Sequence, residues 1–136
     1  MTVIAEKLVL TEIQEVEEPI DTGRLASFAE YNECGAVTSF LGNVRATEKG
    51  VPIKALEYEY HVDLAPRELR KIAEEALGTF DVRRVACVHR VGRVPVGEAS
   101  VAIWIGADHR AAAFQACQYV IDQLKVRVPI WKSIAY

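Results

Sequence analysis

The sequence predicts an α+β fold with a largely antiparallel sheet. Segments that alternate like strands and segments spaced like amphipathic helices follow one another irregularly, without the regular succession of a parallel βαβ protein. Two strand-like segments, residues 84–91 and 99–105, flank a short stretch with Gly and Pro, which favours a hairpin. With 136 residues, 51% hydrophobic and 26% charged, the chain has the composition of one globular domain, residues 1–136.

The N-terminal half is expected to contain three strands and one short helix. Residues 7–10 form the first strand, and a helix begins near Asp21 or Thr22 and ends before Gly35. Its buried positions are expected to be Leu25, Phe28 and Ala29. The next strands are residues 36–41 and 56–60. Between them, residues 43–52 are polar and rich in turn formers, which predicts an exposed loop.

The C-terminal half is expected to add two long helices to the two strands of the hairpin. Asp63 caps the first helix and Gly78 closes it. Its apolar stripe is Leu69, Ile72, Ala73, Ala76 and Leu77. Asp108 caps the second helix, Pro129 ends it, and residues 130–136 run extended. The stripe of this helix is Ala113, Phe114, Cys117, Val120, Ile121 and Leu124.

Composition argues against several classes of function. The net charge of −3 does not indicate a nucleic-acid or membrane partner. The first residues do not show a basic segment followed by an apolar one, so we expect no secretory signal. Polar residues such as Gln115 and Asp122 interrupt the most apolar helix, which argues against a membrane span. The three cysteines, Cys34, Cys87 and Cys117, are odd in number and form no CxxC pair. We therefore expect no disulfide framework, metal site or cofactor, and a cytoplasmic location.

Cationic residues near the last helix are candidates for an anion site. At its start, Asp108-His109-Arg110 combines two cationic side chains with the free N–H groups of a helix N-terminus. The alternative is a simple cap with solvated neighbours. At its end stand Lys125 and Arg127, which also suit the helix dipole without any function. Beyond the helix, Lys132 follows two apolar residues, so we expect it to be partly desolvated.

A third cationic candidate is Arg45, at the mouth of the polar loop. Gly42 before it permits close approach to the backbone, so the N–H groups of Asn43 and Val44 are expected to contribute; a solvated loop arginine is the alternative. The pair 89–90 (His-Arg) lies inside a strand pattern and is interpreted as structural, holding a neighbouring loop. Cys87 and Cys117 occupy apolar positions and are expected in the core.

The residues by themselves lead to a cytoplasmic α+β domain whose cations could gather around a phosphate. No P-loop, GxGxxG, HExxH or GxSxG pattern is present, so no reaction follows from a motif.

In order, four segments resemble the large subunit of molybdopterin synthase. They are GAVTSFLGNVR (35–45), ALEYEYHVDLAPRELRKIAEEA (55–76), RVACVHRVGRVPVGEASVAIWI (84–105) and GADHRAAAFQACQYVIDQLKVRVPIWK (106–132). The resemblance implies an α/β hammerhead-type fold with a small extra β-subdomain. It also implies a homodimer in which each chain binds one small ubiquitin-like subunit, giving a heterotetramer. The small subunit carries a C-terminal thiocarboxylate, whose sulfur is transferred twice to cyclic pyranopterin monophosphate to form molybdopterin.

The family's site residues map onto specific positions of this sequence. Lys125 and Lys132 match the two pocket lysines, with Lys125 expected nearest the thiocarboxylate and Lys132 on the pterin side. The resemblance implies substrate binding by Asn43, Val44, Arg45, His109, Arg110, Ser133 and Ile134. Two positions depart from the family. Asn43 stands where some relatives have a base, and Ser133 stands where an acidic residue is usual.

Two alternatives remain open at this stage. The first is a non-catalytic module that binds a pterin or nucleotide phosphate on the same fold, although a binder does not need both lysines. The second is an enzyme that carries sulfur as a persulfide on its own cysteine, for which Cys34, near a turn, is the candidate.

Overall fold

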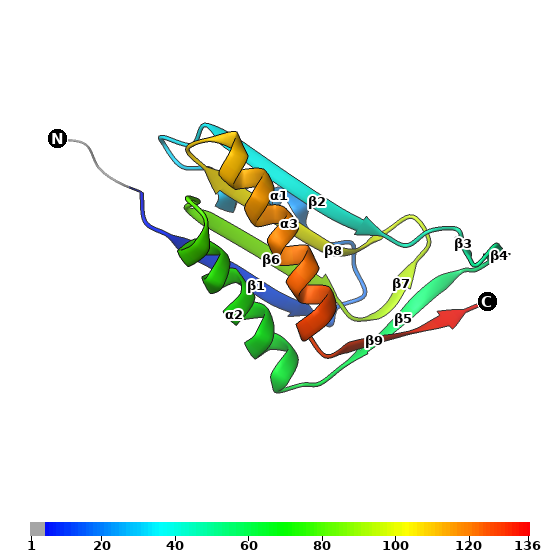
Figure 1. Cartoon of the computed structure of the whole chain (residues 1–136). Helices are drawn as coiled ribbons and strands as arrows, with labels where there is room; N and C mark the ends of the chain where they lie inside the picture. Colours follow the sequence, from blue (N-terminus) through cyan, green and yellow to red (C-terminus); the bar gives the residue numbers. More distant parts are fainter. Residues whose placement is uncertain (1–4) are drawn as a thin grey trace.

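The main sheet has four strands, as the computed structural model of residues 5–136 shows (Figure 1). Its order is β1 (Leu8–Gln14), β6 (Arg84–Arg90), β8 (Ala99–Ala107), β2 (Ala36–Asn43). β1 runs parallel to β6, and the other two pairs are antiparallel. The prediction of an α+β fold with a largely antiparallel sheet is therefore confirmed. Residues 1–4, where we looked for a signal sequence, lie outside the described residues.

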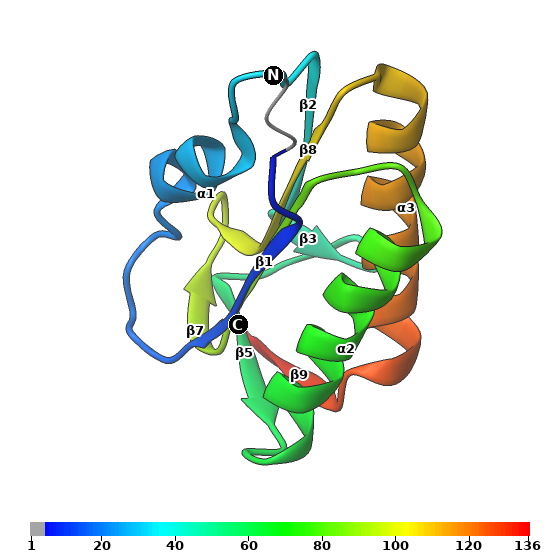
Figure 2. The same cartoon turned by 90° about the vertical axis from the view of Figure 1, so that its left-hand side faces the viewer.

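Helices cover both faces of this sheet (Figure 2). The short α1 (Thr22–Ala29) lies on one face, and α2 (Leu64–Thr79) and α3 (Arg110–Arg127) lie on the other. The larger apolar core fills the space under α2 and α3, and a smaller one, including Leu25 and Val88, lies under α1. Within residues 5–136, no helix combines the length and apolarity that crossing a membrane requires.

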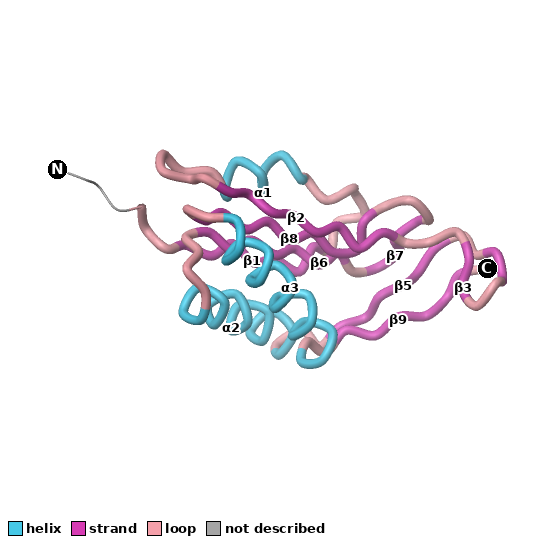
Figure 3. Tube along the Cα trace, turned by 45° about the horizontal axis from the view of Figure 1, so that its top comes forward, coloured by secondary structure: helices cyan, strands magenta, loops and turns pink. Residues whose placement is uncertain are grey.

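A second, smaller set of strands extends from one end of the main sheet (Figure 3). Three of them form a sheet in the order β7 (Gly92–Pro95), β5 (Ala55–Tyr60), β9 (Ile130–Ala135). The other two form a short hairpin, β3 (Thr47–Glu48) with β4 (Val51–Pro52), whose turn residues Lys49 and Gly50 both have positive φ. This is the small β-subdomain that the family resemblance implied.

Two expectations about loops were wrong. The stretch 92–98 is not a plain turn, because it contains β7, which pairs with β5 rather than with its neighbours in sequence. The stretch 43–52 is not wholly exposed, because it contains the β3–β4 hairpin and buries Val44, which is 3% exposed. β7 pairs with a strand distant in sequence, which local patterns do not reveal, whereas β3 and β4 form a local hairpin of only two residues each.

The helix ends agree with the sequence only in part. Asp21 does cap α1, through a bond from the Arg24 N–H to its Oδ1 at 3.2 Å. Asp63 makes no such bond, because the N–H of Ala65 donates to the carbonyl of His61 and Pro66, the next position, has no N–H. α1 ends at Ala29, before Gly35 as expected, but two other bounds differ: Gly78 lies inside α2, and α3 begins after His109 rather than after Asp108.

One residue of the predicted stripe of α3 lies on the wrong side. Phe114 is 65% exposed, whereas Ala113, Cys117, Val120 and Leu124 are buried as expected. Its place in the core is taken by Ala116, whose small side chain fits the close approach of α3 to the sheet.

Two glycines provide a matched test of this packing. A Cβ added at Gly106, in β8, would overlap the backbone carbonyl of Ala29 at the end of α1, whereas one added at Gly78 would meet nothing within 4 Å. We expect Gly106→Ala to lower the free energy of unfolding by about 1–3 kcal/mol through overpacking. Gly78→Ala should raise it by about 0.5–1 kcal/mol, since alanine favours a helix. Chemical denaturation of both variants measures this, and equal effects would contradict the packing.

Candidate active site

Two small cavities meet at the junction of the main sheet and the β-subdomain. The first, of about 170 Å³, is lined by His89, Leu124 and Val128, and is called the lysine cavity below. The second, of about 160 Å³, is lined by Asn43, Arg45, Glu48 and others, and is called the arginine cavity. Three residues line both: Tyr58, Lys125 and Lys132. The two lysines therefore stand between the cavities and can reach a ligand in either.

The end of α3 explains why these lysines meet. The helix stops at Arg127, and Pro129 has no N–H with which to continue it. The chain then turns back as β9, antiparallel to β5, where Lys132 lies opposite Tyr58. Opposed residues of an antiparallel pair share a face, so Lys132 and Tyr58 project together toward the last turn of the helix, which carries Lys125.

Arg45 reaches the site from the end of β2. The pairing of β2 with β8 shifts register between Gly42 and Asn43, which redirects the chain out of the sheet. Val44 then anchors it: the side chain packs in the β-subdomain core, and the N–H donates to the carbonyl of Glu98 at 2.9 Å. The expectation that this N–H is free for a ligand was wrong. The anchor instead fixes Arg45 and Asn43 at the rim of the arginine cavity.

Positive charge in the site lacks protein counter-ions. Among residues 5–136, no hydrogen bond or ion pair involves the side chains of Arg45, Lys125 or Lys132, although nearby cations such as Arg127 are paired. Glu48 lines the arginine cavity as its one carboxylate, and no ion pair joins it to these cations within the same residues. Unpaired cations that converge on a cavity favour an anionic ligand, which would gain charge-assisted hydrogen bonds there.

His89 is a cavity residue that the sequence pattern did not identify. It lies at the end of β6, is 5% exposed, and contacts Tyr58 edge-to-face with ring centroids 5.1 Å apart. Burial lowers its pKa to about 4, and the positive charge of Lys125 acts in the same direction. Strand alternation gave a usable signal, since the apolar residues Val85 and Cys87 precede it at two-residue spacing and predict an inward side chain.

Arg90, by contrast, is structural, as the sequence suggested. It is 2% exposed, and its guanidinium bonds a carboxylate oxygen of Glu98 at 2.8 Å and the carbonyl of Arg93 at 3.0 Å. These bonds tie the end of β6 to the segment that contains β7. The same segment receives the N–H of Val44, so Arg90 indirectly supports the loop that carries Arg45.

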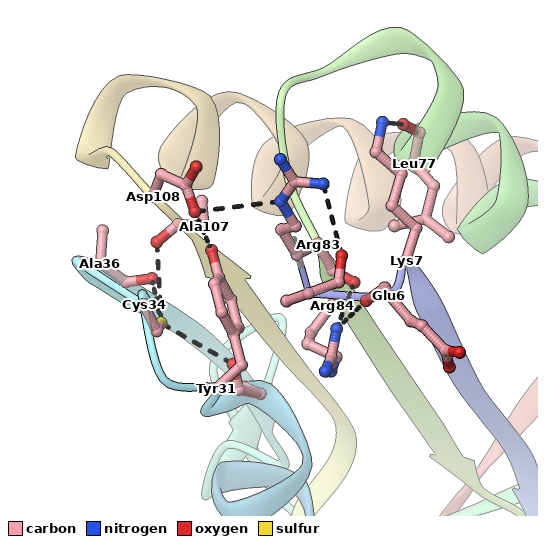
Figure 4. Close-up of polar contacts among 12 residues, drawn as sticks. Glu6, Lys7, Tyr31, Cys34, Ala36, Leu77, Arg83, Arg84, Ala107 and Asp108 are labelled. Carbon is pink, nitrogen blue, oxygen red and sulfur yellow. Dashed lines mark hydrogen bonds and ion pairs between the residues drawn. The ribbon is translucent and has the colours of Figure 1, made fainter. Parts of the chain in front are cut away.

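The other cationic pair lies at the opposite end of α3. His109 occupies the N-cap position without a capping bond, and Arg110 begins the helix. Asp108 does not cap, because it accepts a hydrogen bond from Tyr31 at 2.6 Å and lies 4.0 Å from Arg83 (Figure 4). Arg110 and Lys125 are 15 positions apart, which at about 1.5 Å per residue is roughly 22 Å. One chain therefore does not bring them to the same cavity.

The residues after Lys132 are placed by strand alternation. Ser133 pairs with Glu57 on the exposed face of the β5–β9 ladder, so it points away from Lys132. Ile134 pairs with Leu56 and packs on the core of the β-subdomain. Neither lines the two cavities. Lys132 itself is exposed, so the partial desolvation that we expected from its apolar neighbours is absent in the single chain.

The cysteines form no site. Cys87 and Cys117 are buried as predicted, and burial raises the pKa of both thiols, which suppresses thiolate chemistry. Cys34 is half-buried, with Sγ within 3.8 Å of three backbone carbonyls, those of Ala29, Ala36 and Ala107 (Figure 4). Across residues 5–136, no cluster of His, Cys, Asp and Glu is arranged to hold a metal ion.

Comparison with known proteins gives a consistent family. A family model described as MoaE protein matches residues 15–127. A protein of Arabidopsis thaliana is 39% identical over 132 residues, 97% of this chain and 67% of its own length. A Rattus norvegicus protein is 40% identical over 124 residues, 91% of this chain and 62% of its own. Both are named molybdopterin synthase catalytic subunit, and this chain spans about two thirds of their length.

Solved structures show the same fold. Molybdopterin synthase from Staphylococcus aureus superimposes with a TM-score of 0.83 and 32% identity, covering 92% of this chain and 89% of that one. A complex of subunits 1 and 2 of molybdopterin-converting factor from Helicobacter pylori contains a chain that matches with a TM-score of 0.73 and 25% identity, covering 93% and 88%. These matches extend over the main sheet and the β-subdomain alike.

Proposed function

The chain belongs to the MoaE protein family, and from this premise we propose that it is the catalytic subunit of a molybdopterin synthase, a sulfurtransferase. It takes sulfur from the C-terminal thiocarboxylate of a small ubiquitin-like partner and delivers it to cyclic pyranopterin monophosphate. The observation that carries the proposal is the convergence of Lys125, Lys132 and Arg45 on adjoining cavities, where none of the three makes an ion pair within residues 5–136. Both the sulfur donor and the substrate are anions, so this charge suits them together.

The two cavities suggest separate roles for the cations. Lys125, in the last turn of α3, lies nearest the thiocarboxylate, and Lys132 lines the pterin side. Arg45 and Asn43, at the rim of the arginine cavity, are placed to hold the phosphate. An ammonium can also give or take a proton as the intermediate changes charge, which a guanidinium cannot do near neutral pH.

The sulfur balance is consistent with the absence of a reactive cysteine. In each round the thiocarboxylate sulfur becomes bonded to a substrate carbon as a bond from that carbon to oxygen breaks, and water cleaves the acyl–sulfur bond, so that the partner leaves as a carboxylate. Over the two rounds, one broken C–O bond opens the cyclic phosphate, which stays attached through its other ester, and the other releases the oxygen as water, leaving the dithiolene. No thiol of this chain takes part, which agrees with the buried, high-pKa thiols of Cys87 and Cys117.

We further propose that the active protein is a homodimer within a heterotetramer. The Helicobacter pylori relative was solved as a complex of two different subunits, which supports a small partner. A second copy of this chain is supported by the separation of Arg110 and Lys125, roughly 22 Å along one helix. Across a two-fold axis, His109 and Arg110 of one chain could lie beside the lysines of the other. Strand β2, an edge of the main sheet, and the exposed Phe114 offer surface for such a contact.

A non-catalytic module that binds a pterin phosphate is the competing function. It is favoured by Arg45 and Asn43, which suffice to hold a phosphate, but it leaves both unpaired lysines without a role. We also propose a cytoplasmic location, because three free thiols suit a reducing compartment.

The decisive experiment mixes the purified chain with the thiocarboxylated small subunit and cyclic pyranopterin monophosphate. Mass spectrometry should show the substrate gaining two sulfurs while the partner's thiocarboxylate becomes a carboxylate. Binding of the substrate without any sulfur gain, under conditions where the partner also binds, would support the non-catalytic module instead.

Replacing Lys125 tests the catalytic role. We expect Lys125→Ala to abolish turnover while leaving the fold and partner binding nearly unchanged, because the side chain is exposed and unpaired within residues 5–136. Lys125→Arg should also be poor, since a permanently charged guanidinium does not exchange protons. Lys71→Ala, an exposed lysine on α2, is the matched control and should keep full activity. Substantial dithiolene formation by Lys125→Ala would remove this residue from the mechanism.

Removing all thiols tests the source of sulfur. The triple replacement of Cys34, Cys87 and Cys117 by Ser or Ala should lower stability, chiefly at the two core positions, yet retain sulfur transfer from the partner. Single-turnover assays with the thiocarboxylated partner measure this. Loss of transfer in a folded Cys34→Ala variant would favour the persulfide alternative.

Complementation tests the shared site. Arg110→Ala and Lys125→Ala, each inactive alone, are refolded together so that dimers form at random. If each pocket combines Arg110 of one copy with Lys125 of the other, a mixed dimer has one pocket with both lesions and one with none. About a quarter of wild-type activity should then return by this symmetry. If each pocket lies within one chain, every pocket keeps a lesion and activity stays at the level of the separate variants.

A further inference from the structure

His89 ends a buried column that leads directly to the lysine cavity. Strand alternation places Val85, Cys87 and His89 on the face of β6 that α2 and α3 cover. The first two pack in the apolar core, and the third lines the lysine cavity together with residues from the end of α3 and the start of β9. A histidine at this position is a polar group at the floor of a cavity whose other walls are largely apolar or cationic.

The hydrogen bond of the imidazole fixes which nitrogen faces the cavity. Nδ1 lies 2.8 Å from the carbonyl oxygen of Arg90. Because a carbonyl only accepts, Nδ1 carries the proton and Nε2 presents a lone pair. Within residues 5–136, Nε2 has no hydrogen-bond partner, and it is not among the side-chain atoms sealed from solvent without one. The lone pair is therefore open to the lysine cavity.

The surroundings keep this imidazole uncharged. Burial, together with the positive charge of Lys125, lowers the pKa of His89 to about 4 against the opposing effect of the bond to the Arg90 carbonyl. The side chains beside the ring come from five elements: Ile13 (β1), Tyr58 (β5), Val101 (β8), Lys125 (α3) and Lys132 (β9). None of them is a carboxylate, so no partner there stabilises an imidazolium.

We propose that His89 is a positioning residue for Lys125: its Nε2 accepts a hydrogen bond from the ammonium and directs that ammonium toward the anion entering the cavity. Lys125 is exposed and makes no hydrogen bond within residues 5–136, and it lines the same cavity as His89, so its side chain is available to turn inward and form the proposed bond. A lysine has many rotamers to lose, and a fixed acceptor selects among them. A carboxylate would also hold the ammonium, but it would cancel the charge and compete with the anion. A neutral acceptor orients the charge and leaves it intact.

This role in catalysis rests on the proposed sulfur transfer, but the hydrogen bond itself can be tested without activity. The chain has three histidines, so the ¹⁵N signals of the His89 ring are assigned by comparison with His89→Gln. In the complex with the thiocarboxylated small subunit, Nδ1 should be protonated and Nε2 unprotonated from about pH 5.5 to 8, because the lowered pKa of His89 keeps the imidazole neutral over this range. The Nε2 shift should move when Lys125 is replaced by Met. An Nε2–H tautomer, or an Nε2 shift indifferent to Lys125→Met, overturns the proposal.

The catalytic consequence is tested with two replacements that differ in which nitrogen they imitate. His89→Asn keeps a donor near Nδ1 and lacks the acceptor at Nε2, whereas His89→Gln can place its amide oxygen near Nε2. We expect His89→Asn to lower kcat on the order of 10- to 100-fold with little change in KM for the partner, as misplacement of a catalytic group does. His89→Gln should recover most of that loss. His61→Asn, at an exposed histidine, is the control and should behave as wild type.

The outcomes of this experiment distinguish a positioning role of His89 from a purely structural one. Equal losses in the Asn and Gln variants, with equal losses of thermal stability, would show that His89 only supports the fold and would overturn the positioning role. Full kcat in His89→Asn would overturn it as well. If the wild-type complex transfers no sulfur at all, the proposed function fails, while the ¹⁵N data still decide whether Nε2 receives the Lys125 ammonium.

Discussion

The pairing of β9 with β5 is the constraint on which the site depends. Pro129 ends α3, and its carbonyl accepts the N–H of His61, so the chain is fixed at the point where it reverses. Ile130 to Ala135 then pair residue by residue with β5, which sets Lys132 opposite Tyr58. Without this ladder, Lys132 would lie on a loose segment. With it, two lysines seven positions apart, one on a helix and one on a strand, share the walls of the same cavities.

Charge is divided at the end of α3 so that one cation is structural and one is free. Lys125 and Arg127 both lie in the last turn, but two residues of a helix are about 200° apart and face opposite sides. Arg127 faces α2 and bonds Glu75 at 2.5 Å and Glu68 at 3.3 Å, and these bonds lower the pKa of the Glu75 carboxyl and raise that of the guanidinium. Lys125 faces the cavities, where Glu48 is the one carboxylate and, within residues 5–136, makes no ion pair with it.

The sequence was informative where local patterns decide the structure and silent where distant pairing does. The stripe of α2, the stripe of α3 apart from Phe114, the break at Pro129 and the core cysteines follow from spacing and chemistry alone. The buried N–H of Val44 and the strand β7 depend on partners far along the chain, which no local pattern encodes. Of the site, the family resemblance supplied both lysines and Arg45, but His89 was interpreted as structural, because residue type inside a strand does not show which cavity the strand reaches.

The cations at the N-terminal end of α3 oppose the helix dipole, whereas those at its C-terminal end suit it. This difference supports the proposed shared site. Cations at a helix N-terminus oppose the dipole, and an uncapped end leaves N–H groups unpaired. Here Asp108, the natural cap, is held by Tyr31, while His109 and Arg110 stand at the helix start without it. The arrangement costs helix stability unless an anion is bound there. Because the lysines of the same chain lie roughly 22 Å away on the geometry of one α-helix, the proposed two-fold dimer would let both ends of α3 serve one anionic substrate.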